Sequence, residues 1–173
     1  MPITLVRHAE VEEAYIGKYN GHIDIGLSAK GREQAKALAK ALQSEKYEKI
    51  YCSDLRRARE TLAAFSLDIT PIFTKALREK SWGRHEGKSF EEIEAEGIKY
   101  ENFTQWIAAL DGERVEEFEK RVREFLHSIE QSNANILLVT HAGVIKVIQA
   151  MYKNVSIEET FMQTLAYGEY CML

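Results

Sequence analysis

The sequence has 173 residues, of which 45% are hydrophobic and 29% are charged, and its formal net charge is −4. This length and composition are typical of one globular domain with a sizeable core. The negative charge and the absence of a block of Lys and Arg argue against a general nucleic-acid-binding protein. No apolar run approaches the roughly 18 residues that a membrane-spanning helix needs, so we expect no membrane association.

Two features predict the compartment. The N-terminal segment enters an apolar strand directly and shows no signal peptide. Cys52 and Cys171 are far apart in the sequence and have no metal-site spacing. We therefore expect both to be reduced thiols in or near the core of a cytoplasmic protein.

Strands and helices alternate along the chain, which implies a mostly parallel sheet covered on both faces, an α/β fold. Ser28 and Ser53 are expected to cap the first two helices. The predicted elements are a strand at 2–7, a loop at 8–27, a helix from 28 to about 44, a strand at 49–52, a helix at 54–65, a strand at 71–74, an irregular segment at 77–87, a helical segment at 89–110, a helix at 113–131, a strand at 135–140, a helix at 142–152 and a hairpin within 161–173.

The helical segment 89–110 differs from the others because it is rich in glutamate and has few large apolar side chains. We expect it to form a flap over the site and not a part of the core. No repeat, linker or low-complexity segment divides the chain. The sequence therefore predicts a single domain, 1–173, with a small polar cap at about 84–114.

Two apolar runs each end at a histidine that is followed by a small residue. The first ends at Arg7 and His8, and the second ends at His141. Ligands of open α/β sheets bind beyond the carboxyl ends of the strands, so we expect both imidazoles in one pocket. Neighbouring residues of a strand point to opposite faces, so Arg7 and His8 can converge on a ligand only where the strand gives way to the loop.

Helix starts and charged side chains complete a candidate site. Residues 53–58 follow the second strand, where helix N–H groups and an arginine in the first turn suit an anion. A second helix starts after His141, and Glu79 is the carboxylate nearest to Trp82. Cleavage of a phosphate monoester needs donors for the oxygens, a nucleophile and an acid for the leaving alkoxide. A neutral imidazole can be that nucleophile.

Other interpretations of the same residues remain open at this point. A histidine at a strand end is usually a hydrogen-bonded structural residue, and arginines in a first helical turn are mostly solvated. Glu79 alone would be an ordinary surface residue. The sequence has no P-loop, no dinucleotide-binding glycine motif and no zinc spacing, so we expect neither a cofactor nor a metal.

Six segments, in order, resemble the motifs of the histidine phosphatase superfamily, the phosphoglycerate mutase-like group. Val6-Arg7-His8-Ala9-Glu10 is similar to the Arg-His-Gly motif of that family, and Val139-Thr140-His141-Ala142-Gly143 to its Ser-His-Gly-Gly motif. The resemblance covers nearly the whole chain and implies a three-layer α/β/α sandwich. The remaining segments that match are 21–35, 53–61, 77–87 and 112–122.

The resemblance also implies roles for individual residues. His8 would be the nucleophile that becomes phosphorylated, and Glu79 would donate the proton to the leaving group. The donors to the phosphoryl oxygens would be Arg7, Arg57, His141 and the N–H of Ala142. Asn20 and Gly21 match the loop that lines the pocket. Activity would then be bell-shaped with pH, because His8 must be neutral and Glu79 protonated.

Departures from the family pattern reduce the number of activities that we expect for this chain. Ala14 stands where the mutases have an asparagine, Gly26 replaces a proline and Arg114 replaces a serine. The short cap favours a metal-independent phosphatase of small phosphomonoesters, since water must reach the phosphohistidine. Among the small members of the family, it is the α-ribazole phosphatase subgroup of cobalamin synthesis that the chain resembles in layout.

Three alternatives stay open. One is a phosphoglycerate mutase, another is a phosphoprotein phosphatase and the third is a phosphate-binding module without turnover. We expect a small phosphorylated substrate as the partner, and the sequence allows a monomer or a homodimer.

Overall fold

The computed structural model describes residues 1–130 and 133–173, and within them five strands form one sheet of order β3-β2-β4-β1-β5. The central pairings are parallel, and only β5 runs antiparallel to its neighbour β1. This confirms the prediction of a mostly parallel sheet. The strands are β1 (Ile3–Arg7), β2 (Lys49–Ser53), β3 (Ile72–Thr74), β4 (Ile136–Thr140) and β5 (Tyr170–Met172).

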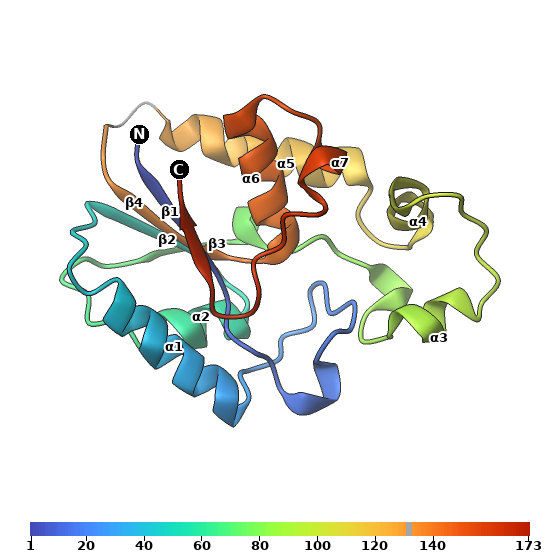
Figure 1. Ribbon diagram of the computed structural model, residues 1–173, viewed down its shortest axis with the longest axis horizontal. Helices are drawn as coiled ribbons and strands as arrows, with labels where there is room; N and C mark the ends of the chain where they lie inside the picture. The colour runs from blue at the N-terminus through green and yellow to red at the C-terminus, as the bar shows by residue number, and fades with distance from the viewer. Residues whose placement is uncertain (131–132) are drawn as a thin grey trace.

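Helices cover both faces of the sheet, as predicted. α1 and α2 lie on one face, and α5 and α6 lie on the other (Figure 1). None of the helices in the two described ranges is long and apolar enough to cross a membrane. The α-helices are α1 (Ala29–Ala41), α2 (Arg56–Leu62), α3 (Phe90–Glu94), α4 (Phe103–Ala109), α5 (Val115–Ile129), α6 (Ala142–Lys153) and α7 (Ile157–Thr160), with short 3-10 helices at Glu13–Tyr15, Lys75–Leu77 and Gly83–His85.

Alternation along the central strands explains the three layers. Ile3 and Leu5 of β1 pack with the side chains of α5 and α6, whereas Val6 packs with those of α1 and α2. All five residues of β4 are buried, as expected for a strand with helices on both faces. Burial of these apolar faces fixes the register of the parallel strands, and with it the place where each strand ends.

The two predicted serine caps have different outcomes. Ser28 caps α1, and its hydroxyl accepts a hydrogen bond of 2.9 Å from the N–H of Gly31. The prediction for Ser53 is wrong, because α2 begins at Arg56 with Leu55 as its N-cap and no side-chain cap. Ser53 is instead the last residue of β2, and its side chain is fully buried at the site.

The predicted C-terminal hairpin is also wrong. The last strand, β5, pairs with β1, with Thr4 opposite Met172 and Val6 opposite Tyr170. Two strands alone are only marginally stable in water, and the open edge of β1 gives β5 a full sheet to join. The predicted helix 113–131 corresponds to α5, which ends at Ile129 with Glu130 as its C-cap, and its last predicted residue lies outside the described residues.

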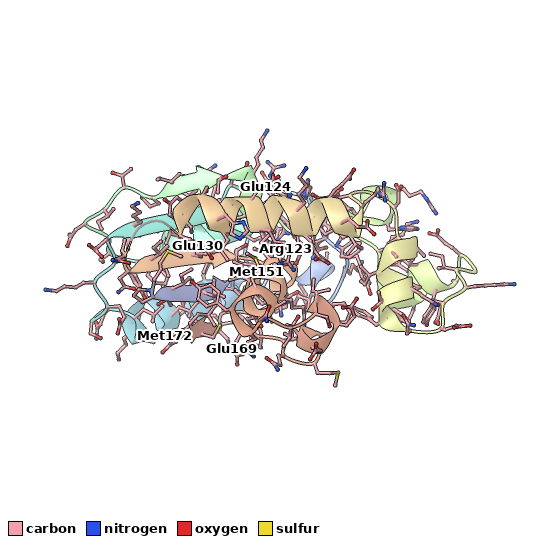
Figure 2. All side chains as sticks on the ribbon, turned by 90° about the horizontal axis from the view of Figure 1, so that it is seen from above. Arg123, Glu124, Glu130, Met151, Glu169 and Met172 are labelled. Carbon is pink, nitrogen blue, oxygen red and sulfur yellow. The ribbon has the colours of Figure 1, made fainter. Side chains whose placement is uncertain are left out.

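The cap (residues 84–114) lies at one end of the molecule in both views (Figure 1 and Figure 2). The segment 89–110 is helical, as predicted, but the expectation that it takes no part in a core is wrong. The segment forms two short helices, with Gly97 at a φ of +83° between them. Ile93, Trp106 and Leu110 pack with Trp82 in a small core of their own. The many exposed glutamates of this segment make it look polar in the sequence, and its small core could not be recognised there.

Candidate active site

His8 is the first residue beyond β1, and its imidazole is fixed by the backbone. Its Nδ1 lies 2.8 Å from the carbonyl oxygen of Ala9. A carbonyl can only accept, so Nδ1 carries the proton and Nε2 keeps its lone pair. Burial, and then the charges of Arg57 and Arg7, hold the pKa of His8 well below its usual value. The ring is therefore neutral at neutral pH, the state that a nucleophile needs.

Two arginines place positive charge beside His8. Arg57, in the first turn of α2, is 2% exposed and donates to the carbonyls of Ile23 (2.8 Å) and Gly21 (2.7 Å). Burial lowers its pKa to about 10, so it stays charged at neutral pH. Arg7 lies over the ring of Tyr167, 4.3 Å from its centroid. Its buried Nε has no hydrogen-bond partner among the described residues.

His141 follows the end of β4, and its ring centroid is 5.1 Å from that of His8. Its Nε2 is 2.8 Å from the hydroxyl of Ser53, which accepts the N–H of Leu55. The hydroxyl can donate its proton to Nε2, and in that arrangement the imidazole proton lies on Nδ1. In the part of the chain that the structure describes, this buried Nδ1 has no partner. Burial, with Arg57 next, holds the pKa of His141 well below its usual value.

Glu79 is tied to the start of α6. Its Oε2 accepts the N–H of Gly143 at 3.0 Å, and its Oε1 accepts the N–H of Lys80 at 3.0 Å. A Cβ on Gly143 would lie 2.2 Å from Oε1, so the contact requires glycine. The main chain of Glu79 is held separately, because its carbonyl accepts a bond of 2.8 Å from the ring of His22.

These side chains surround a cavity of about 170 Å³ at the carboxyl end of the sheet. Seven of the eight predicted site residues line it, and His141 lies against His8. Asn20 donates from Nδ2 to the carbonyl of Tyr15, and its buried Oδ1 has no partner in the described ranges. The cavity is lined by Arg7, His8, Lys18, Tyr19, Asn20, Gly21, Arg57, Glu79, Trp82, Ala142 and Tyr167.

Several residues at the cavity were not predicted. Tyr167 is brought there by the C-terminal segment, because the N–H of Gly168 donates to the carbonyl of His8 at 3.2 Å. Ser53 belongs to a segment that had been singled out, but as a helix cap. Lys18, Tyr19 and Trp82 had no assigned role in the sequence. Among the described residues, no group of three His, Cys, Asp or Glu side chains could hold a metal ion.

The arrangement is suited to a phosphoryl group. In the described ranges, the buried Nε of Arg7 has no hydrogen-bond partner, and the N–H of Ala142, at the first position of α6, has no intrahelical partner. Buried polar atoms rarely remain unpaired, so these groups indicate an anionic ligand. The neutral Nε2 of His8 is at the same cavity, and Glu79 stands on its wall. Groups that could act as donors, as a nucleophile and as an acid thus line the same cavity.

Comparison with known proteins gives one consistent result. Residues 3–173 match the profile of the histidine phosphatase superfamily (branch 1). A protein from Hydrogenobacter thermophilus, provisionally named phosphoserine phosphatase 2, is 35% identical over 163 residues, 89% of this chain and 79% of that protein. The adenosylcobalamin/α-ribazole phosphatase of Salmonella typhimurium is 30% identical over 160 residues, 87% of this chain and 78% of its own.

The fold of a solved relative agrees with these matches. The crystal structure of the α-ribazole phosphatase from Shigella flexneri superposes with a TM-score of 0.86 at 28% identity. The match covers 99% of this chain and 89% of that one.

Proposed function

The chain belongs to the histidine phosphatase superfamily and is a phosphatase; from this premise we propose that it hydrolyses small phosphomonoesters through a phosphohistidine at His8. The observation that carries the proposal is the state of the His8 ring. Its Nδ1–H donates to the carbonyl of Ala9, and its buried Nε2 is unprotonated and lies near the charges of Arg57 and Arg7. No other histidine of the described ranges lines the phosphate-sized cavity.

The reaction would take place in two steps. In the first, Nε2 of His8 bonds to phosphorus while the ester P–O bond breaks, and Glu79 gives its proton to the departing oxygen. In the second, a water oxygen attacks phosphorus while the P–N bond breaks, and Glu79 takes the proton of that water. Inorganic phosphate leaves, and both His8 and Glu79 return to their starting states.

The remaining site residues would stabilise the phosphoryl oxygens. Arg57 and Arg7 supply fixed positive charge, and burial makes that charge more effective than it would be in water. His141 would donate from Nδ1, with Ser53 holding the opposite nitrogen at 2.8 Å. The N–H of Ala142 adds the start of α6, where a helix favours an anion.

Asn20 and Gly21 belong to the loop that forms the other wall of the cavity. The carbonyl of Gly21 holds Arg57 at 2.7 Å, and the Gly21 φ of +50° favours glycine. We assign these two residues to positioning the arginine and lining the phosphate pocket.

The names of the relatives suggest two substrates to test first, α-ribazole 5′-phosphate and phosphoserine. The test is a hydrolysis assay on both, with 3-phosphoglycerate added, without metal and with a chelator. Wild type is compared with His8→Ala and with the matched control His127→Ala, whose histidine is exposed on α5. We expect His8→Ala to lose at least about 10⁴-fold in rate and His127→Ala to keep full activity.

A trapping experiment tests the intermediate itself. Brief reaction with a ³²P-labelled ester, followed by an alkaline quench, should leave label on wild type and on His127→Ala but none on His8→Ala. Hydrolysis that persists in His8→Ala would overturn the proposal. Transfer of the label between the hydroxyls of glycerate, measured in a coupled assay, would favour the mutase instead.

A further inference from the structure

A second hollow, of about 340 Å³, lies next to the cavity that holds His8. The two share Tyr19, Glu79 and Trp82 on their walls. Glu79, the proposed acid, therefore stands where one meets the other. In the proposed reaction the ester oxygen receives that proton, so the substituent on that oxygen would extend from Glu79 into the second hollow. We propose that this hollow binds the alcohol part of the substrate and selects an uncharged, apolar, ring-sized group; the inference rests on the proposed function.

The hollow lies between the cap and the body of the molecule. Phe103 and Ile107 come from α4, while Phe118 comes from α5 and Phe161 follows α7. Phe103 and Phe161 meet edge to face, with 4.9 Å between their ring centroids. In Figure 1, α4 faces the start of α5 and the region of α7. The cap thus closes the hollow with an aromatic contact to the body.

The walls are apolar and large enough for a ring system. A dry cavity of about 150 Å³ already holds benzene in a protein core. The 340 Å³ hollow has room for two fused rings and falls in the range of small-molecule sites. Its apolar lining comprises Trp82, Phe103, Ile107, Ala108, Val115, Phe118, Ile157 and Phe161.

The charges at the hollow disfavour an anionic tail on the alcohol. Lys146 directs Nζ to the carbonyls of Thr160 (3.3 Å) and Phe161 (2.9 Å) and to the hydroxyl of Thr164 (2.7 Å), which uses its three protons. Lys80 is buried, donates to the carbonyl of Ser81 and lies 4.2 Å from the centroid of the Trp82 ring.

Carboxylates outnumber these lysines along the walls. Glu79 stands at the junction, and three further glutamates lie where α5 and α7 meet the hollow: Glu116, Glu119 and Glu158. A carboxylate or a second phosphate on the substrate would therefore lie near negative charges. Neither Lys80 nor Lys146 has all three ammonium protons free to bind it. Phosphorylated acids should be poorer substrates than neutral apolar esters.

The test compares primary alkyl esters, so that the leaving-group chemistry stays the same. The probes are 2-(1-naphthyl)ethyl phosphate, ethyl phosphate and 3-phosphoglycerate. We expect kcat/KM for the naphthylethyl ester to exceed that for ethyl phosphate at least about tenfold. The value for 3-phosphoglycerate should fall below that for ethyl phosphate. A naphthylethyl to ethyl ratio of one or less overturns the inference.

Matched variants locate the effect. Phe103→Ala should lower the naphthylethyl to ethyl ratio about tenfold, and Phe103→Leu should restore part of it. Phe73→Ala is the control, because Phe73 is 47% exposed, Phe103 is 49% exposed and only Phe103 lines the hollow. Glu158→Lys should raise kcat/KM for 3-phosphoglycerate, more at low salt than at high salt. Equal ratios in Phe103→Ala and Phe73→Ala overturn the assignment.

Binding separates this inference from the catalytic proposal. Titration calorimetry with 2-(1-naphthyl)ethyl phosphonate and ethyl phosphonate needs no turnover. If no ester is hydrolysed but the naphthyl compound binds tighter and Phe103→Ala removes the difference, the proposed reaction fails and the hollow keeps its assignment. If the esters are hydrolysed but the two phosphonates bind equally, only the inference fails.

Discussion

Gly143 offers a direct test of how Glu79 is held. In Gly143→Ala, the new Cβ would lie 2.2 Å from Oε1 of Glu79 and 3.1 Å from its Cδ. Atoms in ordinary contact are at least 3.4 Å apart, so the carboxylate must move by more than 1 Å. That movement also breaks the 3.0 Å bond from the Gly143 N–H. The variant therefore displaces the proposed acid without removing it.

The expected cost falls mainly on turnover. Misplacing a catalytic group by about 1 Å costs on the order of 100-fold in rate, and we expect kcat to fall by about that factor with little change in KM. Stability changes less. A hydrogen bond to a charged group contributes about 1.5–3 kcal/mol, and Gly→Ala in a helix returns about 1 kcal/mol. The net loss in the free energy of unfolding is then about 0.5–2 kcal/mol, and the protein stays folded.

The assay measures kcat and the free energy of unfolding of four proteins: wild type, Gly143→Ala, Glu79→Gln and the double variant. If the alanine acts through Glu79, the double variant is no slower than Glu79→Gln alone. The loss should also shrink with p-nitrophenyl phosphate, whose leaving group needs little protonation. Lys36→Ala is the control, because Lys36 lies on α1 with 67% of its side chain exposed and does not line the cavity. Additive losses in the double variant would refute the reasoning.

Two further predictions concern the histidines. Protonation of His8 would remove the proposed nucleophile, and burial with Arg57 holds the pKa of His8 below the usual 6.5. The acid limb of kcat/KM reports the free enzyme, so its midpoint should lie below pH 6.5. A midpoint at or above that pH contradicts the neutral state assigned to His8. Ser53→Ala should lower kcat about tenfold, because His141 loses its 2.8 Å hydrogen-bond partner. Ser53→Thr keeps a hydroxyl and should retain most of the rate. Equal losses of kcat in both variants would show that the hydroxyl does not support His141.

The position of the phosphate cavity could be predicted because strand ends converge by necessity. Arg7, His8 and His141 come at the ends of β1 and β4, which are paired along their whole length. The apolar runs mark those strands in the sequence, and the parallel register brings the residues after them together. Arg57 follows β2 by the same logic, since β2 is the other neighbour of β4.

Residues whose placement depends on long-range packing could not be predicted this way. Tyr167 reaches Arg7 only because the C-terminal segment folds back along β1, where the N–H of Arg7 donates to the carbonyl of Glu169. The alternation of that segment is equally compatible with a hairpin. Ser53 looked like a helix cap because serine is a good cap in any sequence, and only its burial at the end of β2 shows otherwise.

The two parts of the site have different structural origins, and this explains why the sequence indicates the reaction better than the substrate. Phosphoryl chemistry depends on backbone groups at strand ends and helix starts, which the hydrophobic pattern fixes. The second hollow is lined by aromatic residues from four separate segments: Trp82, Phe103, Phe118 and Phe161. These segments meet only when the cap packs on the body. In the sequence, Phe118 and Phe161 resemble ordinary core, whereas Trp82 and Phe103 lie in segments that we expected to be irregular or polar. Exchanging residues of the cap should therefore alter substrate choice while leaving His8 and its arginines in place.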